Sequence, residues 1–424
     1  MSLTCSSSHK PGLIHIAFNQ DNSCICIGTS EGIRIYHIET HQICYRDDIG
    51  AVGIAEMLFC TSLLAYVGAG DQPSLTPRRL SVINTSSSSV IRDLSFSSSV
   101  LAVRLNKQRL VAVLDGRVHV HALQTLAQLR IIETPPNPKG LAALTPCSEP
   151  CCYLALPASA AAGVLRVYDL LVDGGHVVCE VQAHKAPLAA MAWSHDGAFL
   201  ATASSTGTVI RVYSMPHASK AYSFRRGTYP AAVHCLAFSP EGYQPPLLAA
   251  ASSHGTIHLF RLEQPHRSAA AAAASAAAGL LSAVINFAVT DMVEPQRSIA
   301  NIRLPCAGLP AICALQHPTG SSGNAFEGGG GASSLSGQSD VATLPEDADE
   351  VTLVVATAGG LLYEYAVEQL SSAAGPKASL VALATAGGLL YEYVVAQLAV
   401  LGGPKASLGG ELTLLGSAGL AAGA

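Results

Sequence analysis

The chain has 424 residues, a formal net charge of −5 and only 12% charged residues. Because the overall charge is negative, no global basic field draws the protein to nucleic acid or to anionic lipid, and any anion site must be local. The length allows one large β domain or two to three smaller domains.

The twelve cysteines show neither a disulfide framework nor the spacing of a zinc site. We interpret most of them as small buried residues of a protein in a reducing compartment. Residues 1–10 are polar and lack the apolar core of a signal peptide. The sequence therefore predicts a cytosolic protein.

A repeating pattern of short apolar runs begins near residue 13, and clearer copies begin at Leu188 and Val233. Each copy has an apolar run, a second run ending in small residues, a glycine turn and an alternating run. Three or four short strands in every 40–50 residues, roughly, are typical of a β-propeller. The sequence predicts an all-β, seven-bladed β-propeller of degenerate WD40 repeats, with blades starting near Ile14, Gly53, Val100, Leu141, Leu188, Val233 and Ile312.

Two histidines, His119 and His121, fall on one face of a predicted strand of the third blade. No third ligand lies nearby in the sequence, so we interpret them as a packed or surface pair rather than a metal site. The chain has no Gly-x-Ser-x-Gly elbow, no P-loop and no dinucleotide fingerprint. We expect no enzymatic activity, no metal and no cofactor.

The segment Phe224-Arg225-Arg226-Gly227 follows a predicted strand of the fifth blade. Successive side chains of a strand point to opposite sides, so the two arginines cannot easily serve one pocket. Guanidinium groups bind phosphate well, which makes two anion sites, one on either side of the strand, a possible function. The alternative is a solvated basic pair.

Two turns on either side of the arginine pair carry hydroxyl and imidazole groups at matching places. They are Ser204-Ser205-Thr206-Gly207-Thr208 and the segment 252–258, SSHGTIH. A phosphate monoester needs several donors around one arginine, and small Ser and Thr side chains leave room for it. Each turn alone is also explained by ordinary hairpin chemistry. The two turns together, around a central Arg-Arg pair, favour anion binding.

Residues 268–290 carry no charge and begin as an alanine tract. Their length would suffice for a transmembrane helix, but a span here would put two halves of one ring on opposite sides of a membrane. We favour a long loop whose second half forms a short apolar helical face. The face would comprise Leu280, Leu281, Val284, Ile285 and Phe287. An alanine-rich surface insertion without function is equally compatible with the pattern.

We expect the propeller at 10–368, with a loop inserted in blade six at 262–298 and a disordered Gly/Ser-rich and acidic loop in blade seven at 318–350. A tail at 369–424 contains a tandem duplication. ATAGGLLYEY at 356–365 recurs at 384–393, and GPKASL at 375–380 recurs at 403–408. A closed ring has room for one copy, so the other extends from the end, replaces a missing strand or is a sequence error.

Three stretches together resemble one known family. They are residues 67–85 (VGAGDQPSLTPRRLSVINT), residues 131–140 (IIETPPNPKG) and Phe224-Arg225-Arg226-Gly227. The chain resembles the PROPPINs, seven-bladed β-propellers that bind polyphosphoinositides and include the WIPI proteins of autophagy. The resemblance runs from about Leu13 to Glu368.

The resemblance implies two rim sites, in blades five and six, for phosphatidylinositol 3-phosphate and phosphatidylinositol 3,5-bisphosphate. Carried over by position, the first site comprises Arg225, His184, Ser204 and Thr208. The second comprises Arg226, Ser252 or Ser253, Thr256 and His258. The resemblance also implies that the blade-six loop inserts into the bilayer and that an autophagy lipid-transfer partner protein binds around Pro77, Arg78 and Arg79.

These features predict a non-enzymatic scaffold of autophagy, cytoplasmic and peripheral on pre-autophagosomal, vacuolar or endosomal membranes, with no nucleic-acid partner. Two rival interpretations remain. One is a WD-repeat propeller that binds proteins and no lipid. The other is an integral membrane protein that spans at 268–290.

Overall fold

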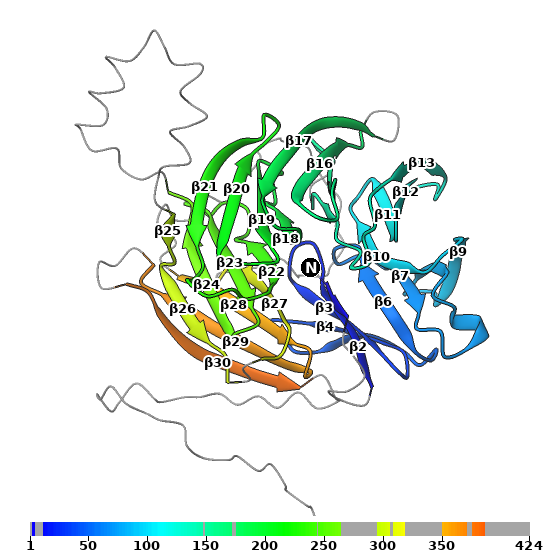
Figure 1. The fold of residues 1–424 in the computed structure, drawn as a ribbon. Helices are drawn as coiled ribbons and strands as arrows, with labels where there is room; N and C mark the ends of the chain where they lie inside the picture. Colours follow the sequence, from blue (N-terminus) through cyan, green and yellow to red (C-terminus); the bar gives the residue numbers. More distant parts are fainter. Residues whose placement is uncertain are drawn as a thin grey trace, which may run out of the picture.

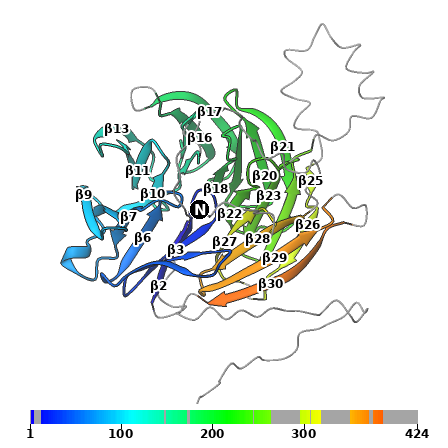
Figure 2. The same ribbon diagram turned by 180° about the vertical axis from the view of Figure 1, so that it is seen from behind.

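The computed structural model describes residues 2–4, 12–146, 149–171, 175–243, 245–263, 295–305, 308–318, 350–370 and 375–385. Seven sheets are arranged around a central axis, as Figures 1 and 2 show from opposite sides. The predicted seven-bladed β-propeller is confirmed. The N-terminus lies at the centre of both views, because β1 (Ser2–Thr4) pairs with the innermost long strand of the first blade.

The first four blades follow one another in chain order. Blade one adds to β1 the strands β2 (Leu13–Phe18), β3 (Cys24–Thr29), β4 (Ile33–His37) and β5 (Ile43–Asp47). Blade two comprises β6 (Val52–Met57), β7 (Leu63–Gly68), β8 (Arg79–Asn84) and β9 (Ser89–Ser95), with the short 3-10 helix η1 (Pro73–Leu75) before β8. Blade three comprises β10 (Val100–Leu105), β11 (Arg109–Leu114), β12 (Arg117–Ala122) and β13 (Gln128–Glu133). Blade four comprises β14 (Ala143–Leu144), β15 (Tyr153–Pro157), β16 (Gly163–Asp169) and β17 (His176–His184).

The last three blades complete the ring. Blade five comprises β18 (Leu188–Trp193), β19 (Phe199–Ser204), β20 (Val209–Ser214), β21 (Ser219–Arg225) and β25 (Gln296–Arg297). Blade six comprises β22 (Val233–Phe238), β23 (Leu247–Ser252), β24 (Thr256–Arg261) and β26 (Ala300–Arg303). Blade seven comprises β27 (Ala311–Gln316), β28 (Glu350–Thr357), β29 (Leu361–Glu368) and β30 (Lys377–Thr385). Apart from β1, which precedes the expected start of blade one, the first strand of every blade begins within two residues of the start expected from the sequence.

The burial of each strand follows its distance from the axis. All six residues of β23 are buried, whereas six of the seven residues of β9 are exposed. An inner strand is covered by the neighbouring blades on both faces, so it reads as a continuous apolar run. The inner strands of blades five and six are rich in alanine, for example at Ala201, Ala203 and Ala249 to Ala251, all buried. Small side chains fit where wedge-shaped blades taper toward the axis.

Blades seven and one close the ring through side chains. The amide of Asn22 donates to the carbonyl of Leu315 over 3.3 Å, and the amide of Gln316 donates back to the carbonyl of Asn22. His41 and Glu364 form a further contact of 2.8 Å between their side chains. Apolar residues of both blades, among them Ile16 of blade one and Leu353 of blade seven, belong to one buried cluster.

The C-terminal boundary differs from the expected one. β30 pairs with β29 over its whole length, so the last blade extends past residue 368. This strand contains the last four residues of the first GPKASL copy and ends at Thr385, two residues into the second ATAGGLLYEY copy. The first copy of the duplication therefore supplies the fourth strand of blade seven. The rest of the second copy lies outside the described residues.

The loop expected at 262–298 is shorter at its C-terminal end. Gln296 and Arg297 form β25, which pairs in parallel with β21 of blade five. The residues expected to insert into a membrane, between 280 and 287, lie outside the described part of the chain, as does the blade-seven segment 319–349. Within the described residues, no helix is long and apolar enough to span a membrane.

Candidate functional site

Phe224 fixes the arginine pair to the core. Its side chain is 1% exposed and stacks on Phe260 of blade six, with ring centroids 4.8 Å apart. Tyr222, two residues earlier on β21, stacks on Phe224 at 5.9 Å. The side of β21 that carries these two rings therefore faces blade six. The neighbouring positions, among them Arg225, point to the side of blade four, because side chains alternate along a strand.

Arg225 is exposed and stands opposite Val209 in the ladder between β20 and β21. No hydrogen bond or ion pair engages its guanidinium group among the described residues. An arginine has five donors and a permanent charge. Arg225 is thus available to an external anion.

Arg226 is placed differently, since only 6% of it is exposed. Its Nε donates to the carbonyl of Gly207, and its Nη2 donates to the carbonyl of Tyr229 over 2.6 Å. Burial lowers the pKa of Arg226 from its ordinary value. Its positive charge also contributes to lowering the pKa of His258 in blade six, after burial as the main cause. Arg226 therefore lies between the blade-five turn and blade six.

The blade-five turn carries Ser204 and Thr208 beside the end of β21. Ser204 is buried, and its hydroxyl forms a 2.7 Å hydrogen bond with that of Thr206. The carbonyl of Thr208 accepts from the backbone N–H of Arg226 over 2.9 Å. Among the described residues no hydrogen bond occupies the hydroxyl of Thr208, which is half-buried. Thr208 is thus the freer of the two hydroxyl groups.

His184 is buried in a closed hydrogen-bond cycle. Arg211 Nη1 donates to its Nδ1 over 3.0 Å, so the ring proton is on Nε2 and is donated to Thr202 Oγ1, also over 3.0 Å. Thr202 Oγ1 in turn donates to the carbonyl of Arg211 over 3.3 Å. Burial and the nearby charge of Arg211 lower the pKa of His184 to about 4. His184 is therefore a neutral residue that joins blade four to blade five.

Arg211 belongs beside the site although the sequence analysis did not single it out. It stands opposite Ser223 in the β20–β21 ladder, and Ser223 shares a strand face with Arg225. The available signal was the alternation Ile210-Arg211-Val212, which places a charge between two buried residues.

The lowered pKa of His184 predicts a loss of stability in mild acid. Below about pH 6.5 the unfolded chain binds a proton at this residue, whereas the folded chain keeps it neutral. The free energy of unfolding therefore falls with pH until the pH reaches about 4, where the folded chain is protonated too. For this group the expected loss between pH 7 and pH 5 is about 2 kcal/mol. Urea unfolding at both pH values measures it. In His184→Gln the pH dependence should be flatter by that amount, and an unchanged dependence would contradict the prediction.

The blade-six turn uses its serines largely for its own structure. Ser252 is buried and donates its hydroxyl to the carbonyl of Thr256 over 3.1 Å, while the hydroxyl of Ser253 accepts from the N–H of Ala232 over 3.2 Å. His258 donates from Nδ1 to the side-chain oxygen of Asn301 over 2.6 Å. The hydroxyl of Thr256 takes part in no hydrogen bond within the described chain.

The predicted partner residues lie together on blade two, where the chain leaves η1 and enters β8. Arg78 is exposed, whereas Pro77 and Arg79 are half-buried. The carbonyl of Arg78 accepts from the N–H of Phe96, and that of Pro77 accepts from the N–H of Val100, each over 2.8 Å. The segment is therefore held firmly against the start of blade three and presents the Arg78 side chain outward.

His119 and His121 form a packed pair, in keeping with the interpretation from the sequence. Their rings stack at 6.5 Å, and the ring of Phe96 meets both at its edge. His119 Nδ1 bonds to the side chain of Gln128 and His121 Nδ1 bonds to the carbonyl of Leu126.

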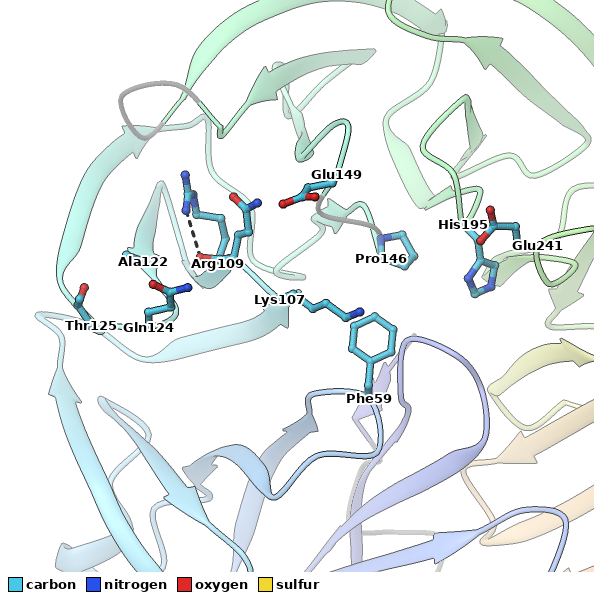
Figure 3. A pocket seen from close by; sticks show the side chains of 11 residues that line it. Phe59, Lys107, Arg109, Ala122, Gln124, Thr125, Pro146, Glu149, His195 and Glu241 are labelled. Atoms are coloured by element: carbon cyan, nitrogen blue, oxygen red, sulfur yellow. Dashed lines mark hydrogen bonds between the residues drawn. The ribbon is translucent and has the colours of Figure 1, made fainter. Parts of the chain in front are cut away.

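A cavity of about 770 Å³ lies at the opposite end of the strands from Arg225 (Figure 3). Connections between the first two strands of blades two to six contribute Phe59, Lys107, Pro146, His195 and Glu241 to its lining. Lys107 Nζ stands 5.2 Å from the centre of the Phe59 ring. The lining includes positive and negative side chains. Its one arginine among the described residues, Arg109, already donates to the carbonyls of Leu170 and Leu171. This cavity offers no concentration of positive charge for an anion.

The fold is that of a seven-bladed β-propeller, and the arginine pair lies at the end of the outer strand β21 of blade five. The family model of the PROPPINs matches residues 12–319, so this chain belongs to the PROPPIN family. Autophagy-related protein 18b of Arabidopsis thaliana is 44% identical over 280 residues, which cover 66% of this chain and 75% of that protein. Autophagy-related protein 18 of Dictyostelium discoideum is 37% identical over 320 residues, which cover 72% of this chain and 84% of that protein.

Solved structures show the same fold. Hsv2 of Kluyveromyces lactis matches with a TM-score of 0.63 and 18% identity over 88% of this chain and 98% of its own. KlAtg21, in a complex with the coiled-coil of AgAtg16, matches with a TM-score of 0.59 and 21% identity over 87% of this chain and 98% of its own.

Proposed function

We propose that this protein is a non-enzymatic scaffold of autophagy that binds phosphatidylinositol 3-phosphate and phosphatidylinositol 3,5-bisphosphate at two rim sites, centred on Arg225 and Arg226. One observation carries the proposal. Arg225 is exposed, and its guanidinium group has no hydrogen bond or ion pair among the described residues, while the alternation of side chains places Arg226 on the side of the strand that faces blade six. Membership of the PROPPIN family and similarity to autophagy-related proteins support it.

Phosphate recognition at each site has a simple physical basis. Charge-assisted hydrogen bonds from a guanidinium group to phosphate are stronger than neutral ones, and two such sites on one rigid body multiply their affinities on a membrane. Tyr229 lies three residues after Arg226 and is 78% exposed. Tyrosine is favoured at membrane interfaces, because its ring is apolar and its hydroxyl polar. These contacts explain how a net-acidic chain docks peripherally on pre-autophagosomal, vacuolar or endosomal membranes.

Two further contacts complete the proposal. The apolar residues between 280 and 287 add burial in the bilayer, and the surface around Arg78 binds a lipid-transfer partner protein. The second candidate function is a propeller that binds proteins and no lipid. The complex of KlAtg21 with a coiled-coil supports protein binding as such. The two candidates differ in whether the arginine pair is needed on a membrane.

Flotation with liposomes tests the proposal. Arg225→Thr/Arg226→Thr should lose most binding to liposomes that contain phosphatidylinositol 3-phosphate, because both sites lose their central charge. Arg46→Thr/Arg117→Thr is the matched control, since it removes the same charge from side chains that are 58% and 54% exposed on blades one and three. Undiminished binding of Arg225→Thr/Arg226→Thr would contradict the proposed lipid sites and favour the second candidate, a propeller that binds proteins. Resistance of the cellular protein to carbonate extraction would instead favour a span at 268–290.

A further inference from the structure

The short segment 295–305 crosses the rim from blade five to blade six. Its first strand, β25, adds to the outer edge of blade five beside β21, and its second strand, β26, is the outer strand of blade six beside β24. Figure 1 shows both strands at the rim, β25 next to β21 and β26 further along in blade six. Each strand carries one arginine, Arg297 or Arg303, and both arginines are exposed.

Arg297 stands directly beside Arg225. The two residues are partners in the parallel ladder between β21 and β25. Partners in neighbouring strands, whose backbones are about 4.8 Å apart, project from the same face of a sheet. Neither guanidinium group has a hydrogen bond or an ion pair within the described chain. Two like charges side by side destabilise a sheet, and an anion between them would remove that cost.

Arg303 occupies the corresponding place on blade six. It is the ladder partner of Thr256, and two residues away Asn301 is the partner of His258. The 2.6 Å hydrogen bond between His258 and Asn301 confirms that these partners share a face. That face looks toward blade five, because Phe260, two residues after His258, stacks on Phe224. Arg303 thus lies on the same side of blade six as the residues predicted to bind phosphate with Arg226. Its guanidinium group has no hydrogen bond or ion pair in the described chain.

We propose that Arg297 and Arg303 are two further phosphate-binding residues, Arg297 acting with Arg225 and Arg303 acting with Arg226. The inference rests on the proposed function and names the residues that complete its two sites. A phosphate monoester carries a charge of about −1.5 to −2 at neutral pH, which one guanidinium group does not balance and two do.

The need for a second arginine is greatest at the blade-six site. Nε and one terminal nitrogen of Arg226 already donate to the carbonyls of Gly207 and Tyr229. Only part of its five-donor fork is left for a ligand. Within the described chain no hydrogen bond uses the donors of the Arg303 guanidinium group, and Arg303 stands beside Thr256, whose hydroxyl is likewise unoccupied there. Arg303 therefore supplies most of the charge-assisted hydrogen bonds of that site.

The test uses the full chain with Arg297→Gln, Arg303→Gln and the pair of changes. Glutamine keeps a polar side chain and removes only the charge, and both positions are exposed, so folding should be unaffected. Arg117→Gln is the control, because it removes one exposed charge from blade three. The dissociation constant is measured with vesicles that contain phosphatidylinositol 3-phosphate in phosphatidylcholine, at physiological salt.

Each single change should weaken binding about tenfold, as expected for the loss of a charge-assisted hydrogen bond, while the control stays within about twofold. Soluble inositol 1,3-bisphosphate, which carries the same phosphates without acyl chains, should also bind each variant more weakly. Single variants that bind like Arg117→Gln would overturn the inference, and so would an equal loss on phosphatidylserine vesicles, which would show a general effect of surface charge.

The same experiment separates the two proposals. If the wild-type chain does not bind the vesicles at all, the proposed function fails and the inference fails with it. If the wild-type chain binds and Arg225→Thr abolishes binding while Arg297→Gln and Arg303→Gln do not weaken it, the proposed function stands and only the inference fails.

Discussion

Phe224→Ala is expected to lower the free energy of unfolding by about 3–5 kcal/mol. The Phe224 ring is 1% exposed and lies between the rings of Tyr222 and Phe260, so its removal leaves a cavity between blades five and six. The cost combines the lost transfer of apolar surface with the cavity that the surrounding strands cannot fill. Equilibrium unfolding in urea measures the effect.

Tyr229→Ala is the control for this prediction, because it truncates an aromatic side chain that is 78% exposed and five residues further on. Its free energy of unfolding should change by less than about 0.5 kcal/mol. A loss below about 1 kcal/mol for Phe224→Ala would mean that blades five and six do not depend on this contact. The first residue of the Phe-Arg-Arg-Gly motif would then need another role.

The blades could be predicted from the sequence because their inner strands are nearly all apolar. Runs such as Leu188 to Trp193 and Val233 to Phe238 recur with the period of a blade, and each became an innermost strand. The outer strands were less visible. The five residues Ser89 to Asp93 of β9 are all exposed, so no apolar pattern marks their position. A strand of two residues, such as β25, depends on its neighbour β21 and has no sequence signal of its own.

The site was predictable in part, because the alternation of side chains along a strand can be read from the sequence. The alternation of a strand placed Arg225 and Arg226 on opposite sides, and the stacking of Tyr222 and Phe224 toward blade six is compatible with that prediction. The two bonds from Arg226 to backbone carbonyls depend on how a turn approaches the strand, which the sequence does not encode locally. The cycle that holds His184 likewise depends on contact between two blades.

The single variants Arg225→Thr and Arg226→Thr should therefore differ: the first should affect vesicle binding alone, the second both binding and stability. Arg225→Thr removes an exposed guanidinium group that bonds to none of the described residues, so we expect vesicle binding to weaken at least about tenfold with little change in stability. Arg226→Thr should weaken binding too, but it also leaves the carbonyls of Gly207 and Tyr229 without their donors. The carbonyl of Gly207 belongs to a buried residue, and a buried group that loses its partner costs about 1–3 kcal/mol.

Binding to vesicles with phosphatidylinositol 3-phosphate and urea unfolding, measured on the same preparations, separate the two effects. Arg226→Lys is the informative third variant, since lysine keeps the charge and loses the fork that reaches both carbonyls. Arg226→Lys should bind the vesicles better than Arg226→Thr, but its free energy of unfolding should be almost as low as that of Arg226→Thr. Equal stability losses for Arg225→Thr and Arg226→Thr would contradict the prediction. In that case the buried bonds of Arg226 would contribute nothing to the fold, and its whole guanidinium group would be available to the lipid.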